Sequence, residues 1–232
     1  MLNSSVERVN KAWDCIEAWY NTNAPKWELP KGATDAEIDA VAAHIKVTLP
    51  EEFRVSLKRH NGTADGQWAH VCLCSTEKIK SEWDTWAECL ENSDYECNED
   101  DIETNDAFQA KWFCESWVPI DSDGTGNNNA LDFAPGPKGQ TGQILYLDHE
   151  DGPSGPKYPD YAGYLEKIAD KLEKGNYAVN DDFLEEIGGS DDEDVEGEEE
   201  NEDGEAGKDS DDGEEDGEDE YEEPKNKKIV KK

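Results

Sequence analysis

Apolar residues spaced three or four positions apart mark helices in the first part of the chain. One such stripe predicts an amphipathic helix and consists of Val6, Val9, Trp13, Ile16 and Tyr20. A second stripe follows Thr34, whose spacing from Glu37 is that of a capping box. A third helix is predicted to open at Pro50 and to end at Asn61 and Gly62, because these two residues tolerate a left-handed backbone. The first 62 residues are therefore predicted to form three helices.

Beyond residue 62 the apolar pattern shortens. Brief apolar runs separated by Gly, Asn, Asp and Pro predict strands over 68–74, 111–120, 130–133 and 143–148. A helix is predicted over 82–90 and an acidic loop over 91–101. A final helix is predicted to start after Asp160, which would cap it, and to stop at Gly175, with one more short turn over 182–187. The predicted order is helices, then strands, then a last helix.

The composition changes at residue 189. Residues 189–232 hold 22 of the 59 acidic residues, six lysines and almost no apolar side chains. Such a segment cannot bury enough surface to offset an ordering entropy of about 1–2 kcal/mol per residue. We therefore expect one domain over 1–188, a disordered acidic tail over 189–223 and a basic end over 224–232. The basic end is interpreted as a nuclear-import signal, a local partner of the acidic run or solvated charge.

The net charge of -37 restricts the partners that the chain can bind. Acidic surfaces repel phosphates, so direct binding of nucleic acid by the domain is not expected, and a basic protein partner is favoured. No apolar run approaches the ~20 residues of a membrane span, and no signal-peptide pattern opens the chain. The six cysteines then predict reduced thiols in a cytoplasmic or nuclear protein without a membrane partner.

Two stretches resemble the signature of a known family. The first runs Leu49-Pro-Glu-Glu-Phe-Arg-Val-Ser-Leu-Lys-Arg-His-Asn-Gly62. The second runs Trp117-Val-Pro-Ile-Asp-Ser-Asp-Gly-Thr-Gly126 and continues at Gly139-Gln-Thr-Gly-Gln-Ile144. With the order of elements over residues 5–180, they resemble the Smi/Knr-like domain of the SUKH superfamily. The matching scaffold positions include Leu49, Pro50, Asn61, Gly62, Trp117, Pro119, Gly126, Asp132, Gly139, Gly142 and Gln143.

The resemblance implies an α+β fold, with a single mixed or antiparallel sheet flanked by helices, and a non-enzymatic role. Members of the family are intracellular protein-binding modules, among them a fungal regulator of cell-wall assembly and bacterial immunity proteins that neutralise toxins. We therefore expect a regulatory or adaptor module, linked to cell-wall or growth signalling, with no cofactor and no small-molecule substrate. Two alternatives stay open. One is a stoichiometric inhibitor of a toxin or other basic protein, and the other is a calcium-binding or histone-binding acidic protein.

The residues that an enzyme would need are scattered along the chain. His44, His60, His70 and His149 form no His-x-x-x-His pair, and no nucleophile-elbow or phosphate-loop motif is present. His60 precedes Asn-Gly at a predicted helix end, where an imidazole interacts favourably with the helix dipole. No catalytic residue and no metal ligand is therefore predicted.

Residues 121–132 resemble the oxygen-ligand spacing of an EF-hand calcium loop. Asp121, Asp123 and Thr125 occupy its first, third and fifth positions, Gly126 the sixth and Asp132 the twelfth. However, Asp132 replaces the bidentate Glu, and the flanking segments are predicted as strands. The competing interpretation is a polar hairpin turn in which Asp132 is buried and hydrogen-bonded.

Eight tryptophans are many for 232 residues. Trp83, Trp86 and Trp112 are flanked by acidic residues, and an aromatic patch rimmed by carboxylates would suit a basic amphipathic segment of a partner. These three are the predicted partner-binding residues. The alternative is a satellite hydrophobic cluster beneath a loop.

Overall fold

The computed structural model describes residues 2–64, 72–92, 102–180 and 183–187. The chain divides into two units, residues 1–190 and 191–232, and all described residues belong to the first. The predicted tail and basic end lie outside the described residues, as does most of the predicted acidic loop. The proposed domain boundary at residue 188 therefore stays a prediction.

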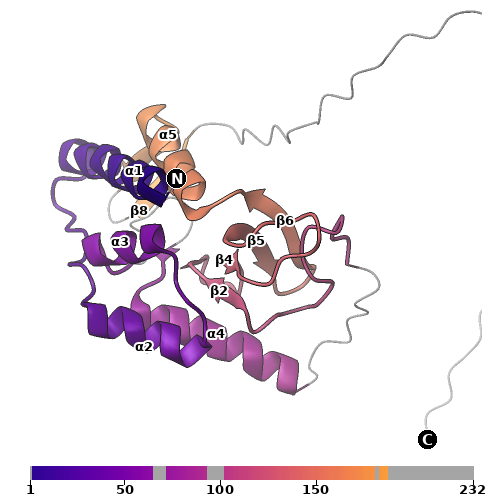
Figure 1. The fold of residues 1–232 in the computed structure, drawn as a ribbon. Helices are drawn as coiled ribbons and strands as arrows, with labels where there is room; N and C mark the ends of the chain where they lie inside the picture. Colours follow the sequence, from indigo (N-terminus) through magenta and orange to yellow (C-terminus); the bar gives the residue numbers. More distant parts are fainter. Residues whose placement is uncertain (1, 65–71, 93–101, 181–182, 188–232) are drawn as a thin grey trace, which may run out of the picture. The chain divides into compact units, whose positions relative to one another are not determined.

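The described part of the chain forms five helices and eight strands. The helices are α1 (Leu2–Asn23), α2 (Asp35–Ile45), α3 (Glu51–Arg59), α4 (Thr76–Glu91) and α5 (Tyr161–Glu173). The strands are β1 (Cys72–Leu73), β2 (Trp117–Pro119), β3 (Asp121–Ser122), β4 (Asn128–Asp132), β5 (Gln143–Asp148), β6 (Gly152–Tyr158), β7 (Tyr177–Asn180) and β8 (Phe183–Glu186). Figure 1 shows α1 beside α5 and α2 beside α4, and α3 contacts α1, α2 and α5.

The strands pair antiparallel throughout the described part. The main sheet has the order β2-β4-β5-β6, and β1 pairs with β3 and β7 with β8. Ile120 joins the β1–β3 pair to the main sheet, because its N–H donates to Asn129 at 2.8 Å and its carbonyl accepts from Cys74 at 2.9 Å. The α+β fold that the family resemblance implied is confirmed.

The main core lies where α1, α2, α3 and α5 meet the sheet. A polar chain crosses this core. Trp13 donates its Nε1–H to the Ser56 hydroxyl at 2.9 Å, and that hydroxyl bonds the Tyr161 hydroxyl at 2.8 Å. Because the three residues come from α1, α3 and α5, the chain fixes the relative positions of these helices while satisfying buried polar groups.

The predicted helix signals at Thr34 and Asp160 are confirmed. The Thr34 hydroxyl accepts from the Glu37 N–H at 3.3 Å, and the Glu37 carboxylate accepts from the Thr34 N–H at 2.7 Å. The Asp160 carboxylate accepts from the Gly163 N–H at 2.6 Å. Each side chain satisfies a backbone donor that the first helical turn leaves without a partner.

Three element predictions are corrected. Helix α4 starts at Thr76 instead of residue 82, because Ser75 caps it by accepting from the Lys78 N–H at 3.2 Å. The strand predicted over 111–120 shrinks to Trp117–Pro119, because the residues before it pack into a second hydrophobic cluster. The turn predicted over 182–187 contains strand β8, which pairs with β7. The strand predicted over 68–74 lies partly outside the described residues, and its described part contains β1.

Strand β6 was not predicted. Its sequence, Gly-Pro-Ser-Gly-Pro-Lys-Tyr, contains two prolines and two glycines. These residues are typical of turns, so the segment does not look like a strand. It forms the outer strand of the main sheet, where a proline is tolerated because its missing N–H removes no bond to a further strand.

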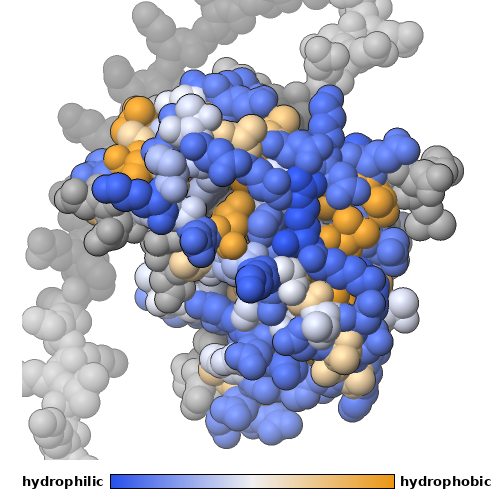
Figure 2. All heavy atoms as spheres, turned by 90° about the vertical axis from the view of Figure 1, so that its left-hand side faces the viewer, coloured by the Kyte–Doolittle hydropathy of each residue, from blue (hydrophilic) through white to orange (hydrophobic). Residues whose placement is uncertain are grey.

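The side of the molecule seen from the left of Figure 1 is mostly hydrophilic. Figure 2 shows apolar side chains there in small groups that are separated by hydrophilic ones. No helix in the described segments is both long and apolar enough to cross a membrane.

Candidate functional site

The three tryptophans predicted to contact a partner lie together, but they are largely inside the molecule. Trp86 is 4% exposed, Trp112 is 8% exposed and Trp83 is half-buried. Trp86 stacks on Phe113 with 5.7 Å between ring centroids, and its Nε1–H donates to Asn128 at 2.7 Å. This arrangement corresponds to the alternative of a satellite hydrophobic cluster. Their partner-binding role stays a prediction, and the site described below does not depend on it.

The family-motif residues of the sheet surround a buried aspartate. Asp132 is fully buried, and its carboxylate accepts from Trp117 Nε1 at 3.0 Å, from the Ala134 N–H at 2.8 Å and from Gln143 Nε2 at 2.9 Å. Burial raises the pKa of Asp132, although these hydrogen bonds act in the opposite direction. The network fastens β2, β4 and β5 to one another and leaves no carboxylate oxygen facing solvent.

The motif residues near α3 define the ends of helices. Leu49 is buried, and Pro50 stands at the N-cap of α3. Asn61 joins the end of α3 to the start of α4, because its Oδ1 accepts from the Thr76 N–H at 2.8 Å and its Nδ2 donates to the Thr76 hydroxyl at 3.2 Å. Gly62 has a φ of 78°, and a Cβ at this position would press against the backbone that leads into α4.

The remaining motif residues lie in turns and at a strand end. Pro119 is the last residue of β2, and Gly126 lies against the ring of His149. A Cβ at Gly139 would clash with the carbonyl oxygen of Ala107, so this backbone approach requires glycine. The Gly142 N–H donates to a main-chain carbonyl of β4 at 2.7 Å. In this structure the motif residues therefore position the backbone.

The residues with EF-hand spacing do not share a centre. The buried Asp121 carboxylate accepts from the Tyr164 hydroxyl at 2.6 Å and from the Asn129 N–H at 2.6 Å. Asp123 accepts from Thr125 within the turn. Asp132 is engaged in its own network, so the predicted polar hairpin turn with a buried Asp132 is confirmed. Within the described residues, no group of three or more His, Cys, Asp or Glu side chains is placed to hold a metal ion.

The described histidines each have a local partner. His60 bonds the Pro30 carbonyl at 2.7 Å through Nδ1 and the Glu17 carboxylate at 2.9 Å through Nε2, so it ties the end of α3 to α1 and to the connector before α2. His149 bonds Asn127 at 2.8 Å. The fourth histidine, His70, lies outside the described residues.

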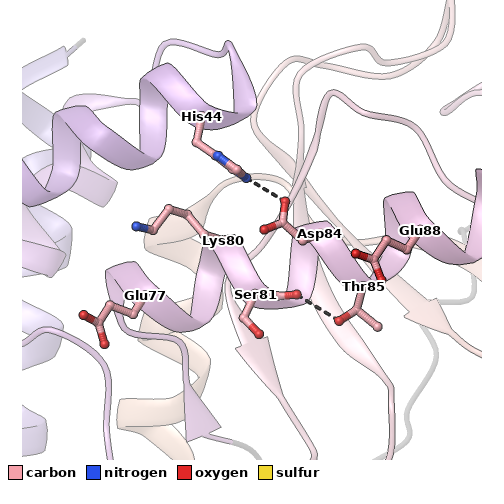
Figure 3. Close-up of a pocket in the computed structure, with 7 residues that line it drawn as sticks. All are labelled: His44, Glu77, Lys80, Ser81, Asp84, Thr85 and Glu88. Atoms are coloured by element: carbon pink, nitrogen blue, oxygen red, sulfur yellow. Dashed lines mark hydrogen bonds and ion pairs between the residues drawn. The ribbon is translucent and has the colours of Figure 1, made fainter.

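The candidate site is a groove of about 460 Å³ between α2 and α4, shown in Figure 3. One residue of α2 and one face of α4 line it: His44, Glu77, Lys80, Ser81, Asp84, Thr85 and Glu88. The six α4 positions recur at steps of three and one, which places them on the same side of a helix. The sequence prediction did not single out this face, although the helix predicted over 82–90 contained Asp84, Thr85 and Glu88.

One exposed polar contact spans the groove between its two helices, which pack on each other through buried apolar residues. His44 Nε2 lies 2.6 Å from Asp84 Oδ1, and the two side chains are 39% and 47% exposed. Along α4, the Thr85 hydroxyl donates to the Ser81 carbonyl at 2.9 Å, as Figure 3 also shows. Glu77 and Glu88 lie toward opposite ends of the groove in Figure 3, with Asp84 between them.

The groove offers mainly hydrogen-bond acceptors and negative charge. Three carboxylates line it, against a single lysine and one histidine. Carboxylates bind lysine and arginine side chains through charge-assisted hydrogen bonds, which are about twice as strong as bonds between neutral groups. The groove is therefore suited to a positively charged segment.

Known proteins resemble this chain over most of the described domain. Residues 32–174, which include every residue of the groove, match the model of the SMI1 / KNR4 family (SUKH-1). The chain is 27% identical over 191 residues to the cell wall biosynthesis/cell cycle regulator smi1 of Schizosaccharomyces pombe, and the match covers 75% of this chain and 38% of that protein.

Two further relatives have similar names. A glucan synthesis regulatory protein of Neurospora crassa is 25% identical over 216 residues, which is 76% of this chain and 41% of the relative. The cell wall assembly regulator SMI1 of Saccharomyces cerevisiae is 21% identical over 220 residues, which is 78% of this chain and 43% of the relative. The chain thus spans less than half the length of these relatives. Because the family model matches more than half of the chain, the chain belongs to the SMI1 / KNR4 family (SUKH-1).

Proposed function

We propose that this chain is a non-enzymatic regulatory domain that binds a basic segment of a protein partner in the groove between α2 and α4. Its relatives are named as regulators of cell-wall synthesis, of glucan synthesis and of the cell cycle, which supports a regulatory role in growth or wall assembly. The binding mode is supported by the groove itself.

The observation that carries the proposal is the row of carboxylates on α4. Glu77 and Glu88 are eleven positions apart, which corresponds to about 16 Å along a helix axis. An extended peptide covers this distance with roughly five residues, since each adds about 3.3 Å. Asp84 lies between the two glutamates, so a segment of this length with two or three basic side chains meets a carboxylate at each end and one in the middle.

The charge of the whole chain adds to this local complementarity. A net charge of -37 attracts a basic partner over a distance of about one Debye length, about 8 Å at physiological ionic strength. Association is therefore expected to be fast and to slow as salt is added. The same field disfavours nucleic acid, whose phosphates carry the same sign as the protein.

A peptide-binding experiment tests the groove. The probe is an array of nonapeptides that combine lysine, arginine and neutral residues, followed by fluorescence anisotropy with the strongest binder. We expect the variant Glu77→Gln/Asp84→Asn/Glu88→Gln to bind this peptide at least tenfold more weakly, because all three charges are removed with little change of shape.

The matched control is Glu7→Gln/Glu28→Gln/Glu51→Gln, which changes the net charge by the same amount at exposed positions outside the groove. This control should bind within twofold of the unmodified chain. Equal losses in both triple variants would show that only the total charge matters, and the groove would then have no specific role.

The regulatory role is tested separately in fission yeast that lacks its smi1 protein. The unmodified chain and the control variant are expected to restore resistance to a wall-digesting glucanase, and the groove variant is not. If the groove variant restores resistance as well as the control, regulation does not pass through the groove.

A further inference from the structure

A second surface pocket has the opposite charge to the groove. It has a volume of about 430 Å³ and lies between the loop that joins β4 to β5 and the end of β6. Eight described residues line it, and two of these are the lysines Lys138 and Lys157, while none is acidic. This composition is unexpected in a chain with 59 acidic and 22 basic residues.

Both lysines are available to an incoming anion. Lys157 is exposed and makes no ion pair within the part of the chain that the structure describes. Lys138 pairs with Asp106 at 3.1 Å, but the two side chains are 71% and 64% exposed. An exposed pair of this kind contributes little to stability, so a stronger anion can replace Asp106 as the partner of Lys138.

The walls of the pocket are fixed before any ligand arrives. Gln143 is 1% exposed, and its Nε2 donates to the Asp132 carboxylate at 2.9 Å while its Oε1 accepts from the Gln140 N–H at 3.0 Å. Gln140 in turn donates its Nε2–H to the Pro159 carbonyl at 2.6 Å. The two sides of the pocket are thus joined, and a preformed site binds without the cost of ordering loops.

The pocket combines these cations with rigid apolar surface. Pro156 and Pro159 have restricted backbones, and the half-buried ring of Tyr158 packs edge-on against Tyr164. Flat rings and proline surfaces suit the main chain and small side chains of an extended peptide, and the lysines at the pocket suit one compact anion.

The overall charge of the protein restricts what that anion can be. A long acidic peptide, a nucleic acid or an anionic membrane brings many negative charges close to a surface that repels them. A single phosphoryl group carries a charge of about -1.5 to -2 at one point and fits two lysines, with little added repulsion when its flanking residues are neutral or basic. We propose that the pocket formed by Lys138, Lys157 and Tyr158 docks a phosphorylated serine or threonine within a neutral or basic segment of a partner protein.

This docking site is separate from the groove, since the two share no lining residue. It goes beyond the proposed function because it makes one interaction of the domain dependent on phosphorylation of the partner. A kinase that phosphorylates the partner protein would then control binding without any change in this chain.

The test uses the full chain and two fluorescent nonapeptides. One carries a central phosphoserine between alanine and lysine residues, and the other is its unphosphorylated twin. We expect the phosphorylated peptide to bind at least tenfold more tightly in an anisotropy titration. Lys138→Ala/Lys157→Ala should abolish this preference, whereas Lys138→Arg/Lys157→Arg should keep most of it because the two charges remain.

The matched control is Lys11→Ala/Lys26→Ala, which removes the same net charge at exposed positions away from the pocket. It should keep the preference for the phosphorylated peptide within twofold, and all variants should have the same thermal melting temperature because the four lysines are exposed. The groove variant described above should also keep the preference.

Three outcomes would overturn the inference. The first is equal binding of the two peptides by the unmodified chain. The second is an equal loss in the pocket variant and in its control, which would assign the effect to total charge. The third is a result in which binding to phosphoinositide-containing vesicles requires Lys138 and Lys157, whereas binding of the phosphopeptide does not. The ligand of the pocket would then be a lipid headgroup.

Discussion

The network around Asp132 and the groove between α2 and α4 contain the same type of polar group in opposite situations. Asp132 is fully buried, and donors from Trp117 and Gln143 occupy its oxygens. Asp84 is about half exposed and has one partner, His44. A buried acceptor without a partner is costly, so the fold satisfies the first group completely. Water satisfies the second until a partner replaces it, so of these two carboxylates only Asp84 keeps capacity to bind.

The residues that identify the family are therefore different from the residues that we propose to bind a basic peptide. The motif residues lie in turns, at element ends and within the sheet, whereas Glu77 and Glu88 belong to no motif. Substitutions in the two regions should therefore affect different measurements.

The largest expected effect is on the interior side. Trp117→Ala removes a fully buried ring and one donor to Asp132, and we expect it to lower the free energy of unfolding by about 3–5 kcal/mol. Urea denaturation followed by circular dichroism measures this loss. A loss below about 1.5 kcal/mol would mean that the ring is not part of the core framework.

A second effect concerns the other buried aspartate and depends on pH. Burial raises the pKa of Asp121 to about 6 in the folded chain, although Tyr164 and Asn129 donate hydrogen bonds that lower it. The folded state therefore holds this proton more tightly than the unfolded chain, whose aspartates have a pKa of about 3.9. The contribution of Asp121 to stability is fully present below about pH 4 and is lost as the pH rises through about 6.

The variant Asp121→Asn isolates this contribution, because other carboxylates titrate equally in both proteins. The free energy of unfolding of the unmodified chain, relative to this variant, should increase by roughly 2 kcal/mol between pH 7 and pH 4. Denaturation at several pH values checks the sign. A difference that stays constant, or that shrinks toward acid pH, would contradict the raised pKa.

A third effect tests hydrogen bonding in the interior without a change of volume. Asp132→Asn replaces one hydrogen-bond-accepting carboxylate oxygen by an amide N–H₂ group. This donor then faces another donor, the Nε1–H of Trp117 or the Nε2–H of Gln143. We expect a loss of roughly 1–3 kcal/mol from the unmatched buried donors. Unfolding at pH 7 measures it, and a neutral result would show that the network repacks around the amide.

The smallest effect on stability is expected in the groove. The triple variant Glu77→Gln/Asp84→Asn/Glu88→Gln should change the free energy of unfolding by less than about 1 kcal/mol, because exposed side chains contribute little to stability. The same variant should lose peptide binding, as described above. A large destabilisation would show that the carboxylates hold α2 and α4 together, and the contrast between interior and groove would then fail.

The starts of α2 and α5 were predictable because their signals are local. The capping box at Thr34 and the cap at Asp160 each act within one helical turn, so neighbouring residues are sufficient to identify them. Strand β5 also has the predicted bounds. Strand β6 was missed because its prolines are acceptable only on an outer strand, and the position of a strand in a sheet is not a local property.

The candidate site was less predictable than the fold. The predicted tryptophans were identified by their number and acidic neighbours, but their burial depends on residues such as Phe113 and Asn128 that pack against Trp86. The groove and the lysine pocket are each built from segments distant in the sequence. Polar residues on a helix face or in a loop carry no pattern that distinguishes a site from an ordinary solvated surface.

The sequence by itself determined the family, the helix boundaries near α2, α3 and α5, and the acidic character of the chain, because motif spacing, caps and charge are properties of the chain order. Only the tertiary structure decided which acidic residues are buried and which remain open. Asp121 and Asp132 are enclosed by donors from other elements, whereas Asp84 lines a gap between two helices. The physical reason is that a carboxylate is available for binding only where the fold leaves its hydrogen-bonding capacity to water.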